Sequence, residues 1–368
     1  MALAIYRKYR PKVFADLLGQ THVVLVLQNA ARRERIAHAY LFSGPRGSGK
    51  TTAARILAKI ANCETRAGDP KFRERGEPCN RCRPCAEIDA GRALDVVEID
   101  AASNRGIDEI RELKESVKLS PSSYRHKVFI IDEVHQLTKD AFNALLKTLE
   151  EPPSHAIFIL ATTELEKVPP TIVSRSQRFQ FKKISVQEIL KKLGAIAAAE
   201  KMKVTQEALE MIAAIAEGSF RDAESLLDQL TSLEDEVDEK AVERILGRAS
   251  FSHVARLAAI ILAGDLKGSL DLLSEITGDG HNPIDLTKEL IHYIRRAMSL
   301  KFDPNLESLF KNEMTDKELA ELKKQSAMID AGRHIPILKS LIRAWSEMRY
   351  SPFAIIPLEV AIIENLRQ

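Results

Sequence analysis

The sequence has few aromatic residues and no long apolar run. Of its 368 residues, 5% are aromatic and only one is tryptophan, while 45% are hydrophobic and 29% are charged, as in ordinary globular proteins. No apolar run approaches the roughly 20 residues that span a bilayer. The N-terminal residues also lack the apolar core of a signal peptide. We therefore expect no membrane attachment and a cytoplasmic location.

A strong excess of either charge is also missing. Lys and Arg number 54 against 52 Asp and Glu, which leaves a net charge of +2. This balance neither favours nor excludes nucleic acid as a partner, so any such contact must come from a local patch. The length predicts two or three domains.

Cysteine is confined to one short window. In a reducing compartment, clustered cysteines are metal ligands more often than disulfides. Two overlapping C-x2-C steps bring thiolates together, and four thiolates form the closed tetrahedral shell of a structural zinc site. An iron–sulfur cluster and the absence of any metal remain open alternatives. The predicted zinc ligands are Cys63, Cys79, Cys82 and Cys85.

We call residues 63–85 the cysteine insertion. Several basic side chains flank the cysteines in it, and they predict an exposed, basic surface. These are Arg66, Lys71, Arg73, Arg75, Arg81 and Arg83.

The first part of the chain alternates apolar runs with helical stretches. Fully apolar runs separated by helices are typical of a buried parallel sheet in an α/β fold. The runs are residues 39–43, 95–99, 128–131 and 156–160. Strand signals stop at about Phe179, and the rest of the chain has helical spacing. The predicted domains are residues 1–178, 179–243 and 244–368.

A phosphate-binding motif follows the first apolar run. Residues 44–51 match G-x4-G-K-T between a predicted strand and a predicted helix, the context that a P-loop requires. Its backbone N–H groups wrap a phosphate, Lys50 reaches the β- and γ-phosphates, and Thr51 contacts Mg²⁺. An ordinary glycine-rich turn is the alternative. The predicted ATP-binding residues are Gly44, Pro45, Arg46, Gly47, Ser48, Gly49, Lys50 and Thr51.

Two carboxylates end the third apolar run. We predict that Asp132 holds the Mg²⁺ shell and that Glu133 is the general base for an attacking water. An acidic helix N-cap would look the same. The complete P-loop upstream favours the catalytic interpretation.

Together these features resemble the AAA+ clamp-loader ATPases, and within them the gamma/tau family of bacterial DNA polymerase III. The resemblance covers essentially the whole chain. It rests on the P-loop, the four cysteines, and residues 9–11, 14–16, 19–20, 131–135, 143–153 and 160–163. It implies an AAA+ core with a parallel sheet and a zinc-knuckle insertion at about residues 63–85. A small helical lid and an all-helical collar for oligomerisation would follow.

The resemblance also implies roles for three further residues. Thr163 matches the sensor-1 position near the γ-phosphate, and Arg221 matches sensor 2 on the lid. Arg175 matches the arginine of a Ser-Arg-Cys motif, which completes the ATP site of a neighbouring subunit. This chain has Ser176 where the family usually has cysteine. A surface salt bridge is the alternative for both arginines.

The resemblance implies contacts with adenine and with DNA less specifically. The N-terminal segment resembles the family's adenine-binding region, with Pro11 and Val23 as candidates; packing alone is the alternative. Arg105 and Lys139 precede or open predicted helices, where they would meet DNA phosphates. Ordinary helix caps with solvated charges are the alternative there.

The resemblance implies an ATP-hydrolysing clamp-loader subunit that uses ATP, Mg²⁺ and Zn²⁺. Its partners would be delta, delta-prime and further gamma/tau copies, the sliding clamp, and primer–template DNA. It would belong to the DNA polymerase III holoenzyme without carrying a polymerase site. Another AAA+ motor and the non-hydrolysing delta-prime scaffold are the alternatives. The intact Lys50, Thr51, Asp132 and Glu133 favour the hydrolysing subunit over the scaffold.

Overall fold

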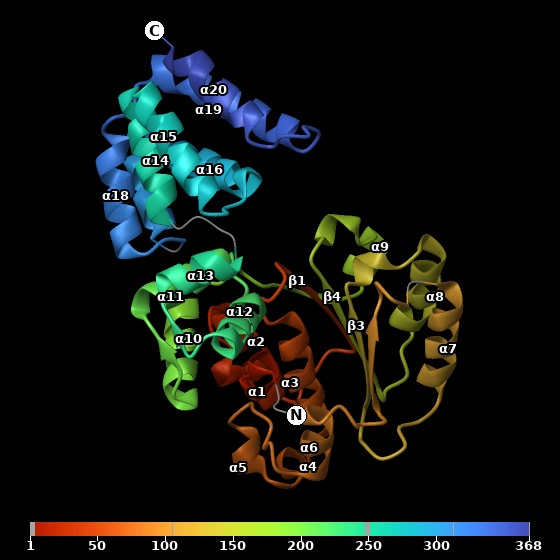
Figure 1. The fold of residues 1–368 in the computed structure, drawn as a ribbon. Coiled ribbons are helices and arrows are strands. Elements are labelled where there is room, and N and C mark those ends of the chain that lie inside the picture. The colour runs from red at the N-terminus through yellow and green to blue at the C-terminus, as the bar shows by residue number, and fades with distance from the viewer. Residues whose placement is uncertain (1–3, 105, 247–250, 312, 368) are drawn as a thin grey trace. The chain divides into compact units, whose positions relative to one another are not determined.

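The computed structural model describes residues 4–104, 106–246, 251–311 and 313–367 (Figure 1). The chain divides into two compact units. The first comprises Met1–Ile184 with Gly218–Asp222, and the second comprises Ser185–Glu217 with Ala223–Gln368. The division into three domains that we expect from the sequence stays a prediction.

The first unit is built on a five-stranded parallel sheet with strand order β2-β3-β4-β1-β5. Its strands are β1 (Ala39–Ser43), β2 (Val96–Asp100), β3 (Lys127–Asp132), β4 (Ala156–Thr162) and β5 (Gln177–Gln180). The parallel sheet is confirmed, and the four apolar runs become four of its strands. β5 was not predicted because only Phe179 among its four residues is buried, so the strand has no apolar run.

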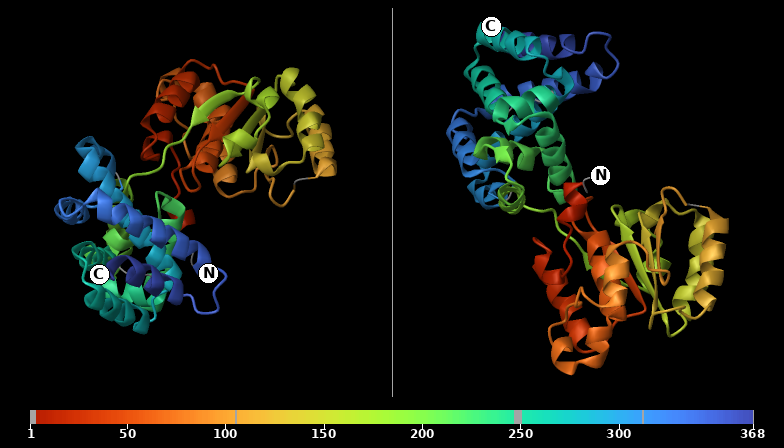
Figure 2. Two further views of the ribbon diagram at one scale, coloured as in Figure 1. Left: turned by 90° about the horizontal axis from the view of Figure 1, so that it is seen from above. Right: turned by 60° about the horizontal axis from the view of Figure 1, so that its bottom comes forward.

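Helices cover both faces of this sheet, as Figures 1 and 2 show. Alternate strand residues point to opposite faces. Tyr40 and Phe42 of β1 pack with α2 (Thr21–Arg32), α3 (Lys50–Asn62) and α6 (Arg83–Asp89). Ala39 and Leu41 pack with the helices of the other face. Those helices are α7 (Ile107–Lys118), α8 (Lys139–Glu150) and α9 (Pro170–Val173).

Short helical segments complete the first unit. They are α1 (Ile5–Lys8), α4 (Glu64–Gly68), α5 (Pro70–Arg73) and the 3-10 turns η1 (Phe14–Asp16), η2 (Val134–Gln136) and η3 (Leu165–Lys167). The parallel register pairs Ser43 with Thr162 and Asp100 with Asp132. The carboxyl ends of β1, β3 and β4 therefore meet at one edge of the sheet, where ligands of open α/β sheets bind.

The second unit is almost entirely helical. Its helices are α10 (Val186–Glu200), α11 (Gln206–Ile215), α12 (Phe220–Leu233, which begins in the first unit), α13 (Glu239–Leu246), α14 (Phe251–Ala263), α15 (Leu266–Gly278), α16 (Pro283–Phe302), η4 (Pro304–Leu306), α17 (Glu307–Phe310), α18 (Asp316–Ser326), α19 (Ala331–Met348) and α20 (Ile356–Leu366). One apolar cluster joins residues of α14, α15, α16, α18, α19 and α20.

The expectation that strand signals end at about Phe179 was wrong in one detail. Two parallel strands of two residues each, β6 (Lys203–Val204) and β7 (Glu236–Val237), pair in the second unit. Elements this short have no periodicity that a sequence pattern can reveal. The pairing sets Lys203 opposite Glu236.

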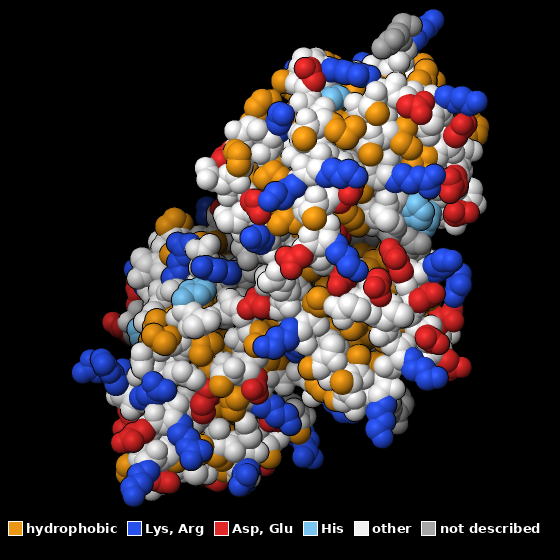
Figure 3. Space-filling view, turned by 90° about the vertical axis from the view of Figure 1, so that its left-hand side faces the viewer, with side chains coloured by type: hydrophobic (Ala, Val, Ile, Leu, Met, Phe, Trp, Pro, Cys, Tyr) orange, Lys and Arg blue, Asp and Glu red, His pale blue; other side chains and the backbone are white. Residues whose placement is uncertain are grey.

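The surface agrees with the near-zero net charge. On the face seen in Figure 3, described Lys and Arg side chains are interspersed with Asp and Glu, and neither sign holds a large area. Among the described helices, none combines the length and the apolar character that crossing a membrane requires.

Candidate nucleotide site and metal centre

The P-loop connects β1 to α3 and depends on glycine. Gly44 and Gly47 have φ of 148° and 71°, in the region that side chains disfavour. A Cβ at Gly44 would lie 2.4 Å from the carbonyl oxygen of Phe181, and one at Gly47 would lie 1.9 Å from Ser219 Oγ. No larger residue fits at either position without moving its neighbours.

Lys50 begins α3 and is 5% exposed. Its Nζ donates to the carbonyl oxygens of Gly44 at 2.8 Å and Pro45 at 2.9 Å. Burial lowers the pKa of Lys50, and the carboxylates of Glu133 and Asp132 partly offset that effect. The ammonium group therefore lies inside the loop, with both acidic residues of the motif near enough to act on it.

Thr51 and Asp132 are brought together from different parts of the chain. Thr51 Oγ1 donates to Asp132 Oδ2 at 2.7 Å, although 81 positions separate the two residues. Adjacent ligands in an octahedral Mg²⁺ shell, each at about 2.1 Å from the metal, lie about 3 Å apart. The hydroxyl and the carboxylate therefore fit Mg²⁺ in both donor type and spacing.

Glu133 follows Asp132 in a left-handed backbone conformation, with φ 47° and ψ 44°. Its Oε2 accepts hydrogen bonds from Thr163 Oγ1 at 2.9 Å and from Thr163 N at 3.3 Å. The candidate base is thus held by the residue just after β4. The structure brings Lys50, Thr51, Asp132, Glu133 and Thr163 to the same edge of the sheet.

His135 is a further residue beside the acidic pair, and the sequence motifs do not predict its position. Its Nδ1 lies 3.0 Å from Thr162 Oγ1 and 3.4 Å from Glu133 Oε2, and its side chain is only 3% exposed. It lies two residues after Glu133, within residues 131–135 that carry the resemblance. Its place two residues after the acidic pair was the available signal.

Arg221 lies within the first unit, near the N-terminus of the chain. Its guanidinium carbon is 5.3 Å from the ring centroid of Tyr6. Ser219 Oγ accepts from the backbone N–H of Asp222 at 3.2 Å and borders Gly47 of the P-loop. The segment that carries Arg221 therefore lies directly against the phosphate-binding loop.

Arg175 has a different environment. Its Nε donates to Glu150 Oε1 at 2.9 Å, and its Nη1 donates to the carbonyl oxygen of Thr171 at 2.9 Å. Its side chain is 34% exposed. Among the described residues, Glu150, Thr171 and Ser174 are partners of Arg175 that lie outside both the P-loop and the acidic pair. That Arg175 acts in the site of a neighbouring subunit stays a prediction.

The residues predicted to contact adenine or DNA differ in how exposed they are. Pro11 is partly exposed, whereas Val23 is 2% exposed and packs in the core of the first unit. Lys139 is exposed at the start of α8, whose cap is Thr138, with Oγ1 accepting from the backbone N–H of Ala141 at 3.3 Å. Arg105 lies outside the described residues.

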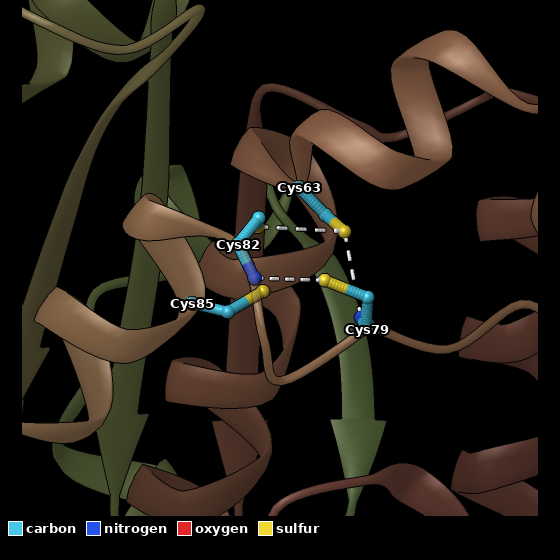
Figure 4. A group of neighbouring side chains, drawn as sticks. All are labelled: Cys63, Cys79, Cys82 and Cys85. Carbon is cyan, nitrogen blue, oxygen red and sulfur yellow. Dashed lines mark hydrogen bonds between the residues drawn. The ribbon is translucent and has the colours of Figure 1, made fainter.

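The four cysteine side chains converge on one point, as Figure 4 shows. All four are free thiols, and their Sγ atoms lie within 4.8 Å of one another. Zn–S bonds of about 2.3 Å in a tetrahedron place the sulfurs about 3.8 Å apart, so the cluster fits zinc in donor type and size. The pKa of Cys63 is held well below its usual range, and the hydrogen bond from Cys85 is the largest cause of this lowering. Backbone N–H groups of Arg81 and Cys82 also donate to Cys79 Sγ, at 3.4 and 3.2 Å.

The cysteine insertion is not uniformly exposed. Arg66 is only 7% exposed and donates to the carbonyl oxygens of Ile60 at 2.9 Å and Ala31 at 2.6 Å. The expectation of an exposed basic surface was therefore wrong for this arginine. Its guanidinium satisfies buried carbonyl groups, which composition alone does not reveal.

Comparison with known families matches nearly the whole chain. Residues 19–185 match the family described as DNA polymerase III, delta subunit. Residues 188–233 match the DNA polymerase III clamp loader subunit, ATPase lid domain. Residues 237–367 match DNA polymerase III subunits gamma and tau domain III.

Two individual relatives, from Bacillus subtilis and Buchnera aphidicola, agree with these matches. DNA polymerase III subunit tau of Bacillus subtilis is 44% identical over 363 residues, covering 98% of this chain and 62% of that protein. DNA polymerase III subunit gamma of Buchnera aphidicola is 36% identical over 359 residues, covering 97% of this chain and 96% of that protein. The Thermotoga maritima RuvB Holliday junction branch migration motor, a solved structure, is 21% identical. It covers 69% of this chain and 79% of its own, with a TM-score of 0.47.

Proposed function

Since the chain belongs to the gamma/tau family of DNA polymerase III subunits, we propose that it is the ATP-hydrolysing subunit of a clamp loader. The observation that carries this proposal is the pairing of Thr51 with Asp132 at 2.7 Å, beside Glu133 and Lys50. The chain spans about 62% of the length of its Bacillus subtilis relative. Activity, substrate and partners are therefore part of the proposal.

The P-loop would bind the triphosphate of ATP. Backbone N–H groups of residues 44–49 would surround the phosphates, except at Pro45, which has none, and the α3 N-terminus would add a favourable partial charge. Lys50, already aimed into the loop, binds the β- and γ-phosphates. Thr51 and Asp132 would hold Mg²⁺, which would neutralise charge on the phosphate oxygens.

Glu133 would act as general base. A water molecule gives a proton to the Glu133 carboxylate as its oxygen attacks the γ-phosphorus, and the bond to the ADP oxygen breaks. The products are ADP and inorganic phosphate. Thr163 donates to Glu133 Oε2 and so fixes the direction of the carboxylate. The sensor-1 role of Thr163 would act through this bond as well as on the γ-phosphate.

The two arginines would act on different ATP molecules. Arg221 follows Ser219, which borders the P-loop of its own chain, and would contact the nucleotide bound there. Arg175 would complete the site of a neighbouring subunit, where an added arginine stabilises transition-state charge. Ser176 replaces the usual cysteine of that motif while the arginine is retained.

The four cysteines would hold a structural zinc. Cys63, Cys79, Cys82 and Cys85 make a closed shell without an open position, so the metal would stabilise the insertion and take no part in phosphoryl transfer.

We extend the proposal to partners and domains. Residues 1–178 would form the ATPase core, residues 179–243 the lid and residues 244–368 the oligomerising collar. Bound ATP would let an assembly with delta, delta-prime and further gamma/tau copies open the sliding clamp on primer–template DNA, and hydrolysis would release both. Arg105 and Lys139 would contact DNA phosphates, while Pro11 and Val23 would border the adenine.

A second candidate is a binding subunit that does not hydrolyse ATP. It is favoured by the match of residues 19–185 to the family described as DNA polymerase III, delta subunit. The complete Lys50–Thr51 and Asp132–Glu133 pairs argue against it, because a scaffold has no chemical need for them.

ATP turnover separates the two candidates. Purified protein, combined with partner subunits, clamp and primed DNA, should hydrolyse ATP, and Lys50→Ala should reduce turnover to background. Lys191→Ala, the same change at an exposed position of α10, is the matched control and should behave as wild type. Turnover in the Lys50→Ala protein equal to that of the control would overturn the hydrolysing assignment.

A further inference from the structure

The N-terminal segment that would border the adenine lies on the P-loop. Leu17 Cδ2 is 2.7 Å from where a Cβ of Gly49 would stand. Gln20 Nε2 donates to the carbonyl oxygen of Ser48 at 3.3 Å and to that of Lys182 at 2.8 Å. The stretch between Pro11 and Val23 is therefore in direct contact with the loop that would bind phosphate.

The cysteine insertion binds this same stretch through hydrogen bonds to Glu77. Glu77 Oε2 accepts from the backbone N–H of Phe14 at 2.8 Å, and Oε1 accepts from that of Ala15 at 2.9 Å. Oε1 also accepts from Gln28 Nε2, on α2, at 2.7 Å. Both carboxylate oxygens thus hold the turn η1, which ends directly before Leu17.

Lys59 makes a second connection from inside the core. Its side chain is 1% exposed, although it lies on α3, the helix that the P-loop opens. Its Nζ contacts the carbonyl oxygen of Lys12 at 2.9 Å, Asn80 Oδ1 at 2.8 Å and Asp89 Oδ1 at 2.8 Å. One ammonium group therefore joins the N-terminal segment to the loop between Cys79 and Cys82.

We propose that the cysteine insertion positions the adenine side of the nucleotide site, with Glu77 and Lys59 as the positioning residues. Glu77 fixes the backbone at Phe14 and Ala15, and Lys59 fixes it at Lys12. This inference rests on the proposed function, because it assumes that ATP binds at the P-loop. It assigns the insertion a part in nucleotide affinity without any contact between the insertion and the nucleotide.

The test uses Glu77→Gln in the full chain. The amide offers one acceptor oxygen where the carboxylate offers two, and its NH₂ group would face a backbone N–H. Glu74→Gln, the same change at an exposed position of the same insertion, is the matched control. MgATP and magnesium tripolyphosphate are titrated separately, because tripolyphosphate has no base and reports on the P-loop alone. Zinc content and hydrogen exchange of residues 11–20 are measured on the same samples.

We expect Glu77→Gln to weaken MgATP binding by roughly tenfold and to change tripolyphosphate binding by less than about twofold. Amides of residues 14 and 15 should exchange faster, while zinc content and Glu74→Gln match wild type. A merely structural role would lower the affinity for both ligands equally, and that result would overturn the proposal. So would wild-type MgATP affinity in Glu77→Gln. If wild-type protein binds neither ligand, the proposed ATP site itself is wrong.

Discussion

The candidate nucleotide site and the cysteine insertion lie in the same unit, but the chain assembles them over different distances. Thr51 meets Asp132 only because β1 and β3 belong to one parallel sheet. The four cysteines meet within 23 positions of one another. The first site requires the folded sheet, whereas the second can close around a metal locally.

The two sites also differ in what their polar groups contact. Lys50, Thr51 and Glu133 each have strong oxygen or nitrogen partners on the protein. The cysteine sulfurs instead accept from backbone N–H groups at 3.2 to 3.4 Å and from one another. The nucleotide site is therefore held by the protein itself, while the cysteine cluster would draw its stability from a metal. Changes in the first should affect turnover, and changes in the second should affect stability.

Among variants expected to keep nucleotide binding, Glu133→Gln should have the largest effect on turnover. Loss of the base should lower turnover in the assembled complex by roughly 10²- to 10⁴-fold, while MgATP affinity stays within about threefold. Glu166→Gln, at an exposed position after β4, is the control. Steady-state phosphate release and an ATP-binding isotherm give the two numbers. A variant that hydrolyses at more than about a tenth of the wild-type rate would remove Glu133 from the base role.

Arg175→Ala should have the next largest effect. It should lower turnover of the assembled complex by about 10²-fold or more and leave MgATP affinity of the isolated subunit unchanged. Arg178→Ala, at an exposed position of β5, is the control for loss of a surface arginine. Equal loss of nucleotide affinity in the isolated subunit would mean that Arg175 serves its own site.

Thr163→Val tests the hydrogen bond from the Thr163 hydroxyl to Glu133, because valine has nearly the same volume as threonine. It removes the hydroxyl that donates to Glu133 Oε2 but keeps the backbone N–H bond. We expect turnover to fall by roughly tenfold, because a bond to a charged group contributes about 1.5–3 kcal/mol. Thr171→Val, at an exposed position of α9, is the control. Unchanged turnover would show that the Glu133–Thr163 bond has no catalytic consequence.

The smallest effect on turnover should come from Cys82→Ser. At saturating ATP, turnover should stay within about twofold, while the Tm falls by about 5–10 °C, from loss of ~2–3 kcal/mol of metal-linked stability. Elemental analysis should find bound zinc in wild type and little in the variant. A chelator should lower the Tm of wild type and leave that of Cys82→Ser unchanged. Wild-type protein without zinc would refute the structural-zinc proposal, and a collapse of saturating turnover would refute the separation of the two sites.

That the P-loop and the acidic pair come together could be predicted, because each half of the candidate nucleotide site is a contiguous motif. The glycines and Lys50 are adjacent, and Asp132 directly follows the apolar run of residues 128–131 in β3. Parallel topology then brings the halves together. The four cysteines could be predicted for the same reason, since their spacing is short.

Contacts between segments without a shared motif could not be predicted. Glu77 bonds to Phe14, Ala15 and Gln28, which lie 49 to 63 positions away. Arg66 looks like any surface arginine in the sequence, yet it is buried against two carbonyl groups. These pairings depend on the packing of the insertion against α2, and no local periodicity encodes that packing.

Lys59 limits how the insertion can be removed by design. A deletion of residues 63–85 would take Asn80 from a buried ammonium group and Glu77 from the N–H groups of Phe14 and Ala15. Lys59 would keep the carbonyl oxygen of Lys12 and the carboxylate of Asp89. A lost hydrogen bond to a charged group costs about 1.5–3 kcal/mol, a sizeable share of the roughly 5–15 kcal/mol that keeps a domain folded. A designer who wishes to remove the loop must therefore supply Lys59 with a new partner as well as reconnect the chain.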